Sequence, residues 1–167
     1  MKILQAPNKI LNQKTKAVPK VDSKVLSLIG EMWKLMDEAK GVGLAAPQVG
    51  KSISLAIIGF EPTAKMLEKN PKLVSIPKII LINPKIVWNS KDTSIEKEGC
   101  LSCGKTEVEV PRFKKIHVEH LDENGKKKKT KARGMVARAM QHEIDHLQGK
   151  LITDYQKSSA PTSPANL

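Results

Sequence analysis

Two histidines near the carboxyl end of the chain have the spacing of metal ligands. His142 and His146 are four residues apart, so on an α-helix their side chains lie about 40° apart on one face and can reach a single ion. Glu143 projects beside them, close enough to act on a water molecule at that ion. The segment His-Glu-Ile-Asp-His therefore predicts a metal site with its own acid–base residue.

A catalytic site of this kind takes three protein ligands and leaves one position for water, so a third ligand is needed. The downstream choices are poor, because Ile152 stands where one class of metallopeptidase has a third histidine and no glutamate follows Glu143. The best upstream candidate is Cys100, since a thiolate binds borderline divalent ions well and the adjoining Gly99 permits close backbone approach.

Cys100 and Cys103 form a C-x-x-C pair, which keeps two other interpretations open. One is a structural zinc site that also uses His117 and His120, and the other is a redox pair. His117 and His120 would point to opposite faces of a strand, which disfavours a shared ion. A redox pair usually sits at a strand-to-helix junction, and we expect none here.

The elements that must position these residues can be inferred from hydrophobic periodicity. From about residue 134 to 148 apolar residues recur at helical spacing, and Gly149 can end that helix. A second amphipathic helix is predicted for residues 22–40, with Asp22 or Ser23 as its cap. Residues 41–50 are rich in Gly, Pro and small side chains, which predicts an irregular or extended strip between helix and sheet.

Strands are predicted at residues 54–60, 78–83, 86–88, 107–110, 114–121 and 126–131. The last two should form a hairpin through Asp122-Glu123-Asn124-Gly125, with the four-lysine run on a solvated edge. Residues 61–77 contain three prolines and look like a surface excursion without chemistry. We expect one domain over residues 1–156 and a flexible tail over residues 157–167.

Composition and net charge indicate which classes of partner the protein can bind. The net charge is +12, and such a field attracts nucleic acids, ribosomes and other acidic surfaces. Only 3% of residues are aromatic and few lie among the lysines, so we expect a lysine-rich surface and no specific nucleic-acid site. No run is apolar enough for a membrane span and the amino terminus does not resemble a signal peptide, so a cytoplasmic protein without membrane contact is predicted.

Three separate blocks of the sequence resemble the peptide deformylase family, in the order that the family has them. They are Gly41-Val42-Gly43-Leu44-Ala45-Ala46-Pro47-Gln48, Glu98-Gly99-Cys100-Leu101-Ser102 and Gln141-His142-Glu143-Ile144-Asp145-His146-Leu147. The resemblance covers roughly residues 3–155. It implies an α+β fold, in which antiparallel β-sheets surround a central metal-binding helix and the first helix packs outside.

The resemblance also implies an activity, namely removal of the N-formyl group from the formyl-methionine of nascent polypeptides, with release of formate. Cys100, His142 and His146 would bind one divalent metal ion, physiologically Fe²⁺, although Zn²⁺, Ni²⁺ or Co²⁺ also suit such ligands. Glu143 would be the acid–base residue, and Gln48 and the backbone N–H of Leu101 would face the formyl oxygen. The residues expected to bind the substrate are Val42, Gly43, Gly99, Met135, Ala139 and the ring face of His142.

Some features depart from the family or leave the function open. Cys103 and Gly104 follow Ser102 where the family has an apolar residue and proline, which puts substrate preference in doubt. Arg138 is expected to be solvated. Members often carry a longer C-terminal helix implicated in ribosome docking, so contact with the ribosome is expected here from surface charge alone. A metallopeptidase and a zinc-stabilised nucleic-acid-binding module are the alternative functions.

Overall fold

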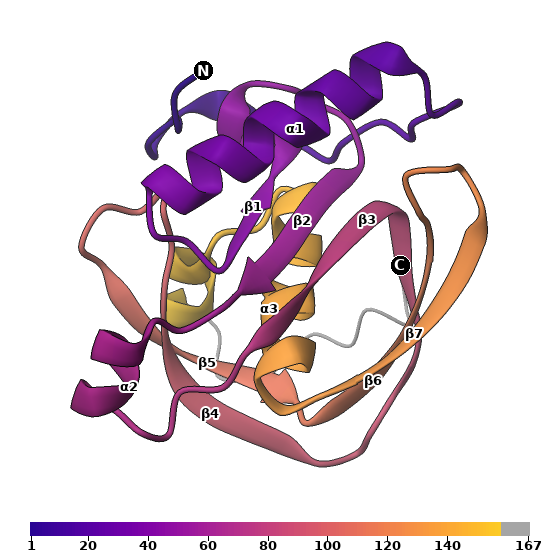
Figure 1. The fold of residues 1–167 in the computed structure, drawn as a ribbon. Helices are drawn as coiled ribbons and strands as arrows, with labels where there is room; N and C mark the ends of the chain where they lie inside the picture. Colours follow the sequence, from indigo (N-terminus) through magenta and orange to yellow (C-terminus); the bar gives the residue numbers. More distant parts are fainter. Residues whose placement is uncertain (158–167) are drawn as a thin grey trace.

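The computed structural model describes residues 1–157 of the chain, and Figure 1 shows their arrangement. The helices are α1 (Ser23–Glu38), α2 (Ala64–Lys69) and α3 (Gly134–Leu147), with short 3₁₀ helices at η1 (Lys9–Asn12), η2 (Ala46–Val49) and η3 (Ile152–Lys157). The strands are β1 (Gly43–Ala45), β2 (Leu55–Phe60), β3 (Ile76–Asn89), β4 (Thr93–Gly99), β5 (Glu107–Phe113), β6 (Lys115–Leu121) and β7 (Lys127–Arg133). The predicted tail lies outside the described residues, except for Lys157, which ends η3.

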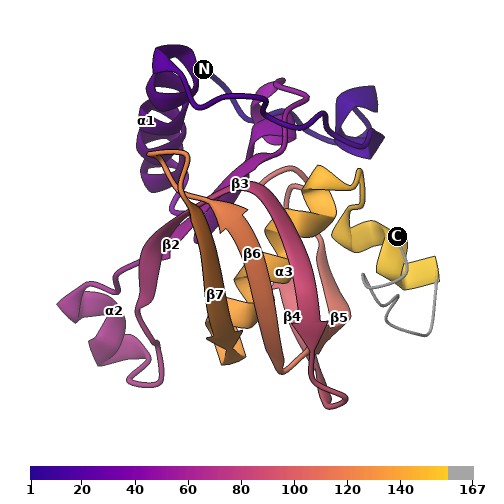
Figure 2. The same ribbon diagram turned by 90° about the vertical axis from the view of Figure 1, so that its right-hand side faces the viewer.

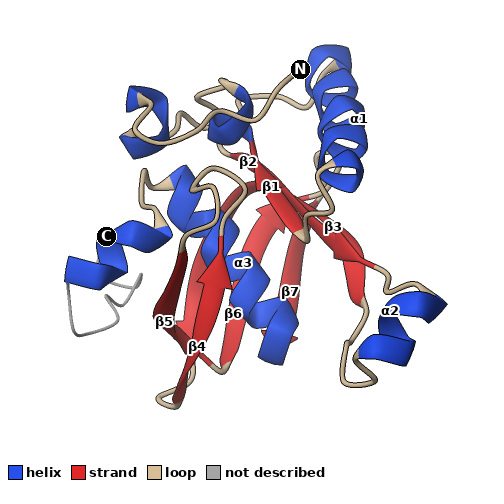
Figure 3. Cartoon of the chain, turned by 90° about the vertical axis from the view of Figure 1, so that its left-hand side faces the viewer, coloured by secondary structure: helices blue, strands red, loops and turns tan. Residues whose placement is uncertain are grey.

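Two antiparallel sheets surround α3. The larger has the strand order β1-β2-β3-β6-β7 and the smaller pairs β4 with β5. Figures 1 and 3 show α3 in the middle of the molecule, enclosed by these strands, with α1 packed outside. The α+β prediction with a central helix is therefore confirmed.

The core explains this arrangement. One face of α3 carries Ala137, Met140, Ile144 and Leu147, all buried, and packs against the inner side of the larger sheet. A second apolar cluster lies between α1 and the outer side of β1 and β2, where Ile29, Met32 and Met36 are buried. Asp22 caps α1 by accepting the Val25 N–H at 2.9 Å, as the sequence predicts.

Gly149 ends α3 in the left-handed conformation, with φ of +76°. A Cβ there would lie 2.8 Å from the backbone carbon of Asn12, so only glycine allows the amino-terminal segment to approach. The predicted hairpin is also present. The Asp122 carboxylate accepts the N–H groups of Asn124 and Lys126, each at 2.9 Å, and β7 is an edge strand.

β3 is one long strand where the sequence predicts two. It stays paired through register shifts on both sides of Lys85, and Asn83 adopts a φ of +51° just before Pro84. The Asn83 side chain donates to the Val18 carbonyl and accepts the Val18 N–H, both at 2.8 Å. This irregularity accommodates a proline that lacks the N–H a regular ladder needs.

Apart from the short 3₁₀ helices, two elements have no counterpart in the sequence prediction. α2 lies in the predicted surface excursion, is capped by Thr63 and buries none of its residues, so it carries no apolar periodicity to detect. β4 exposes Ile95 and buries Glu98, the reverse of the pattern that identifies a half-buried strand. Within residues 1–157, no helix has both the length and the apolar character required to cross a bilayer.

Candidate active site

Cys100, His142 and His146 meet in the space between α3 and the end of β4. Each offers one ligand atom, and these atoms all lie within 4.8 Å of one another. Cys100 Sγ is 3.3 Å from His146 Nε2, and the two imidazole rings are edge-to-face with centroids 5.0 Å apart. Sulfur and nitrogen ligands of one tetrahedral ion lie about 3.5 Å apart, so the donor set fits a single ion.

The protonation of the two histidines is set by their surroundings. Burial opposes charge on His142, but hydrogen bonds with Cys100 and Glu98 outweigh it and raise its pKa to about 10. Burial and the neighbouring His142 lower the pKa of His146 well below its usual range. A ligand imidazole must be neutral, so an ion would displace a proton from His142 and bind more tightly as pH rises.

Glu98 orients His142 from behind the site. Its Oε2 lies 3.0 Å from His142 Nδ1, which leaves Nε2 for an ion. Burial alone would raise the pKa of Glu98, but hydrogen bonds from His142 and Arg112 hold it well below its usual range. Glu98 is therefore ionised and His142 donates to it.

Two buried arginines hold Glu98 in place. Arg112 donates to both carboxylate oxygens at 2.9 Å, and Arg138 donates to Oε1 at 2.6 Å and to the Val110 carbonyl at 3.0 Å. Arg112 also pairs with Asp145, one residue before His146. The prediction of a solvated Arg138 is wrong, because its side chain is 7% exposed and links α3 to β4 and β5.

Glu143 is buried beside Cys100 and the two histidines, and its Oε2 has no hydrogen-bond partner among the described residues. Burial is the main cause that raises its pKa to about 7. Gly43 makes room for it, since a Cβ at Gly43 would lie 2.3 Å from Glu143 Oε1. The sequence predicts Gly43 as a substrate-binding residue in an extended strip, and this close approach to Glu143 is an additional requirement for glycine.

Gln48 is fixed with its amide nitrogen facing Cys100. Its Oε1 accepts the Ala45 N–H at 2.8 Å, while Nε2 lies 3.1 Å from Ser102 Oγ and 3.8 Å from Cys100 Sγ. The Ser102 N–H also reaches Cys100 Sγ at 3.4 Å. Ser102 is thus part of the site, although the sequence analysis gave it no role.

A cavity of about 520 Å³ opens onto these groups. It brings together every predicted site residue except His146, which lies behind it: Val42, Gly43, Gln48, Gly99, Cys100, Leu101, Met135, Ala139, His142 and Glu143. Met135 and Val42 are 45% and 41% exposed at its rim, whereas Ala139 is buried. One end of the cavity is thus apolar and the other carries the ionisable groups.

The structural-zinc interpretation has no support in the described part of the chain. His120 hydrogen-bonds Thr130 at 3.0 Å and His117 stacks on Trp88 at the opposite face of β6. Cys103 is half-buried, and burial together with the nearby Cys100 raises the pKa of its thiol to about 12. Among residues 1–157, the only group of three side chains with metal-ligand spacing is Cys100, His142 and His146.

Comparison with known proteins decides between the remaining interpretations. The family model described as polypeptide deformylase matches residues 1–161. The chain belongs to this family. It is 37% identical to the peptide deformylase of Bartonella tribocorum, over 92% of this chain and 82% of that protein. It is 42% identical to that of Dictyoglomus thermophilum, over 87% of this chain and 85% of that one.

Solved deformylase structures share the fold. The Ehrlichia chaffeensis enzyme in complex with actinonin has a TM-score of 0.84 and 35% identity, covering 93% of this chain and 87% of that one. An Acinetobacter baumannii peptide deformylase with Met-Ala-Ser bound has a TM-score of 0.84 and 29% identity, covering 92% and 96%. The chain is a deformylase that removes the N-formyl group from nascent polypeptides, in a family that depends on a metal ion.

Proposed function

We propose that Cys100, His142 and His146 hold the catalytic metal ion of this deformylase, and that the ion is Fe²⁺ in the cell. The donor atoms have suitable spacing, and Glu98 and the two arginines fix the orientation of His142. Zn²⁺, Ni²⁺ and Co²⁺ also suit a thiolate with two imidazoles, and availability decides among them. Metal analysis of protein purified without air tests the assignment.

Glu143 is proposed as the acid–base residue. An ion in this site, when bound, supplies Lewis acidity and lowers the pKa of water toward about 7. Glu143 then takes the proton of the water that attacks the formyl carbon, and returns a proton to the departing amine. Its pKa of about 7 suits both transfers.

Gln48 and the backbone N–H of Leu101 are proposed to donate hydrogen bonds to the formyl oxygen as it becomes negative. Gln48 supports this role best, because the Ala45 N–H holds its Oε1 in place. One N–H of its NH₂ group donates to Ser102 Oγ, and the other can face the cavity beside Cys100. Such donors act without reorganisation, and loss of one typically costs about 3 kcal/mol of transition-state stabilisation.

The methionine side chain of the substrate is proposed to lie against Val42, Met135, Ala139 and the ring face of His142, with Gly43 and Gly99 beside the peptide backbone. β1 is an edge strand, so a peptide can extend the sheet by main-chain hydrogen bonds to it. The Acinetobacter baumannii structure carries Met-Ala-Ser, the tripeptide that remains when formyl-Met-Ala-Ser loses its formyl group. We propose a similar substrate here.

The observation that carries the proposal is that Glu143 Oε2, which has no hydrogen-bond partner among residues 1–157, lies beside three converging donor side chains. The test is formate release from formyl-Met-Ala-Ser by iron-loaded protein handled without air. We expect turnover of this peptide and none of Met-Ala-Ser. A protein that binds one ion and cleaves Met-Ala-Ser internally, releasing no formate, would instead be a metallopeptidase.

Nascent peptides as substrates favour a cytoplasmic location, which cell fractionation can test. We also propose that the +12 charge draws the enzyme electrostatically to ribosomes. Association should then weaken steeply as salt rises, and co-sedimentation with ribosomes that did not change with salt would contradict this.

A further inference from the structure

One side of the larger sheet is covered and the other is open. The inner side of β3, β6 and β7 packs on α3, and Figure 2 shows the outer side of these strands with no helix across it. Six cations and an aromatic pair occupy this outer side, which we call the lysine face. Its residues are Lys85, Trp88, Lys115, His117, Lys127, Lys129, Lys131 and Arg133.

Strand register places these residues together. On β6, Ile116, Val118 and His120 are buried, so the alternate residues point outward. The outward positions Lys115, His117, Glu119 and Leu121 are paired with Arg133, Lys131, Lys129 and Lys127 of β7. Lys85 of β3 is paired with Glu119, and Trp88 with His117. Successive cations along β7 are thus about 6.8 Å apart on one face.

The positive charge of the lysine face is little compensated. Glu119 is the one carboxylate paired with residues of this face, and it lies 3.8 Å from Lys129 with both side chains more than half exposed. Such exposed pairs are weak. Within the described residues, the other five cations form no ion pair. A hollow of about 490 Å³ also borders this face, lined partly by Lys85 and the lysines at 127–129.

Trp88 adds a stacking surface. Its side chain is 46% exposed, although the chain has only five Phe, Trp and Tyr residues and the other four are not exposed. It stacks on His117 with ring centroids 4.5 Å apart and an angle of 31°. Aromatic surfaces beside cations bind the bases of single-stranded nucleic acids, while the cations bind the phosphates.

We propose that the lysine face binds single-stranded RNA, with phosphates on the cations of β6 and β7 and a base against Trp88. The sequence predicted no nucleic-acid site because aromatic residues are absent from the lysine run, but strand pairing brings Trp88 to it. We choose RNA as the ligand because the enzyme acts on nascent polypeptides, which emerge from an RNA-rich assembly. This binding is separate from the catalytic cavity.

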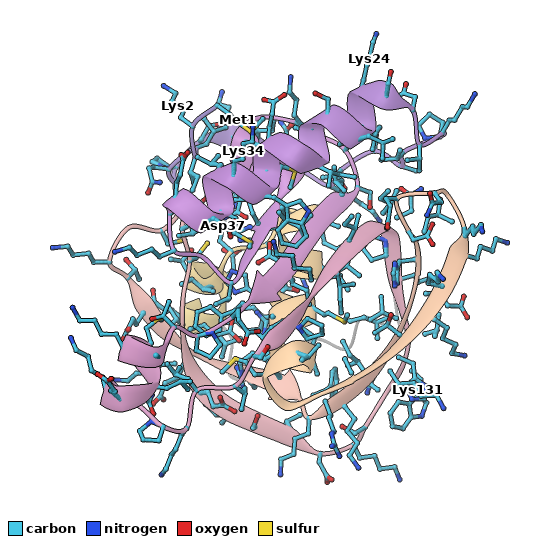
Figure 4. All side chains as sticks on the ribbon, in the orientation of Figure 1. Met1, Lys2, Lys24, Lys34, Asp37 and Lys131 are labelled. Carbon is cyan, nitrogen blue, oxygen red and sulfur yellow. The ribbon has the colours of Figure 1, made fainter. Side chains whose placement is uncertain are left out.

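The charge part of the proposal is tested by fluorescence anisotropy with a labelled oligouridylate of about ten nucleotides. Lys127→Gln/Lys129→Gln/Lys131→Gln is compared with Lys2→Gln/Lys24→Gln/Lys34→Gln, which removes the same charge from exposed residues elsewhere (Figure 4). Between about 50 and 200 mM salt, the first variant should lower the slope of log affinity against log salt by about 2, and the second should leave it unchanged. Equal weakening by both variants would overturn the proposal, because binding would then reflect net charge alone.

The stacking part is tested with Trp88→Ala, which should weaken oligouridylate binding about 5- to 100-fold at every salt concentration. Trp88→Phe should restore most of the affinity. Formate release and circular dichroism should match the wild type, since Trp88 lies outside the catalytic cavity. If Trp88→Ala bound oligouridylate as tightly as the wild type does, the lysine face would be a polyanion surface that does not bind bases. The same conclusion would follow if heparin displaced the labelled oligouridylate as well as unlabelled oligouridylate does.

Two further measurements test which molecule covers the lysine face. Single-stranded DNA offers the same phosphates and base faces and should bind comparably in this assay. Double-stranded RNA keeps its bases stacked and should bind less tightly than oligouridylate, and equal binding would overturn the assignment to single strands. Sedimentation should show a monomer whose mass is unaffected by Trp88→Ala. A dimer that dissociates in this variant would mean that a second copy of the chain covers the lysine face, and would overturn RNA binding.

Discussion

At the scale of single residues, Glu143 has the environment that a general base needs. It is buried, its Oε2 has no partner in the described part of the chain, and its pKa is raised to about 7. Only the carboxylate form can accept a proton. A bound cation favours that form, so kcat/KM of the metal-loaded enzyme should fall about tenfold per pH unit on an acid limb that lies below about 7. A profile of kcat/KM against pH for formyl-Met-Ala-Ser checks this.

Glu143→Gln should retain the metal and lose about 10²- to 10⁴-fold in kcat, because the amide cannot accept the proton of water. Metal content measured alongside kcat separates loss of the base from loss of the ion. If the variant kept more than about a tenth of the wild-type kcat, a different base would be needed.

Gly43 permits the position of Glu143, since a Cβ would lie 2.3 Å from its Oε1. Gly43→Ala should therefore displace the carboxylate and lower kcat about 100-fold, in line with the sensitivity of catalysis to misplacement of about 1 Å. Gly30→Ala in α1 is the matched control, because nothing lies within 4 Å of its added Cβ. The control should keep full activity and gain about 1 kcal/mol of stability. Equal activity of both variants would show that Glu143 moves freely.

At the scale of elements, Glu98 joins β4 to α3 and to β5. Arg112 and Arg138 reach it from β5 and α3, and His142 lies on its other side. These bonds explain why a strand with a polar inner side is stable next to the central helix. They also explain why two arginines are buried. Arg112 has carboxylate and phenol partners, and Arg138 has carboxylate and carbonyl partners.

Arg112→Met should cost about 3–5 kcal/mol of unfolding free energy, because it leaves the buried Glu98 and the half-buried Asp145 with fewer partners. Lys129→Met, which removes an exposed ion pair with Glu119, should cost less than about 1 kcal/mol. Urea denaturation of both variants gives the comparison. Similar small losses would indicate that Arg138 alone satisfies Glu98.

Lowering the pH should weaken the contacts by which Glu98 joins β4 to α3 and β5. The pKa of Glu98 is depressed in the folded protein relative to its ordinary value of 4.5, so its contribution to stability is complete above that value and is lost as pH falls below it. In Glu98→Gln this part of the acid sensitivity should be absent. Urea midpoints measured from neutral pH down to about 3 would reveal the difference.

At the scale of the whole molecule, an ion held by the proposed ligands Cys100, His142 and His146 would join the end of β4 to α3 and should stabilise the fold. An ion at about 1,000 times its dissociation constant contributes about 4 kcal/mol, or about 8–16 °C in Tm for a chain of this size. Thermal unfolding with and without Zn²⁺ measures the shift. Cys103→Ser should keep it and Cys100→Ser should lose most of it, and the reverse result would make Cys103 the ligand.

The metal site could be predicted from sequence to the extent that local spacing determines it. The helical period places His142, Glu143 and His146 on one side of α3, and the absence of suitable downstream residues points to Cys100. The helices at residues 22–40 and 134–148 were predictable for the same reason. β4 was not, because its buried residue is the charged Glu98.

Tertiary structure alone decided which distant residues meet. The contact of Glu98 with His142, the space that Gly43 leaves for Glu143 and the position of Trp88 beside the lysines of β7 each join residues far apart in the chain. Such contacts depend on strand order and register, and a shift of one residue would turn every side chain of a strand to the other face. The local pattern of the sequence carries the ligands and the base, whereas the pairing of strands sets their orientation and builds the open cationic face.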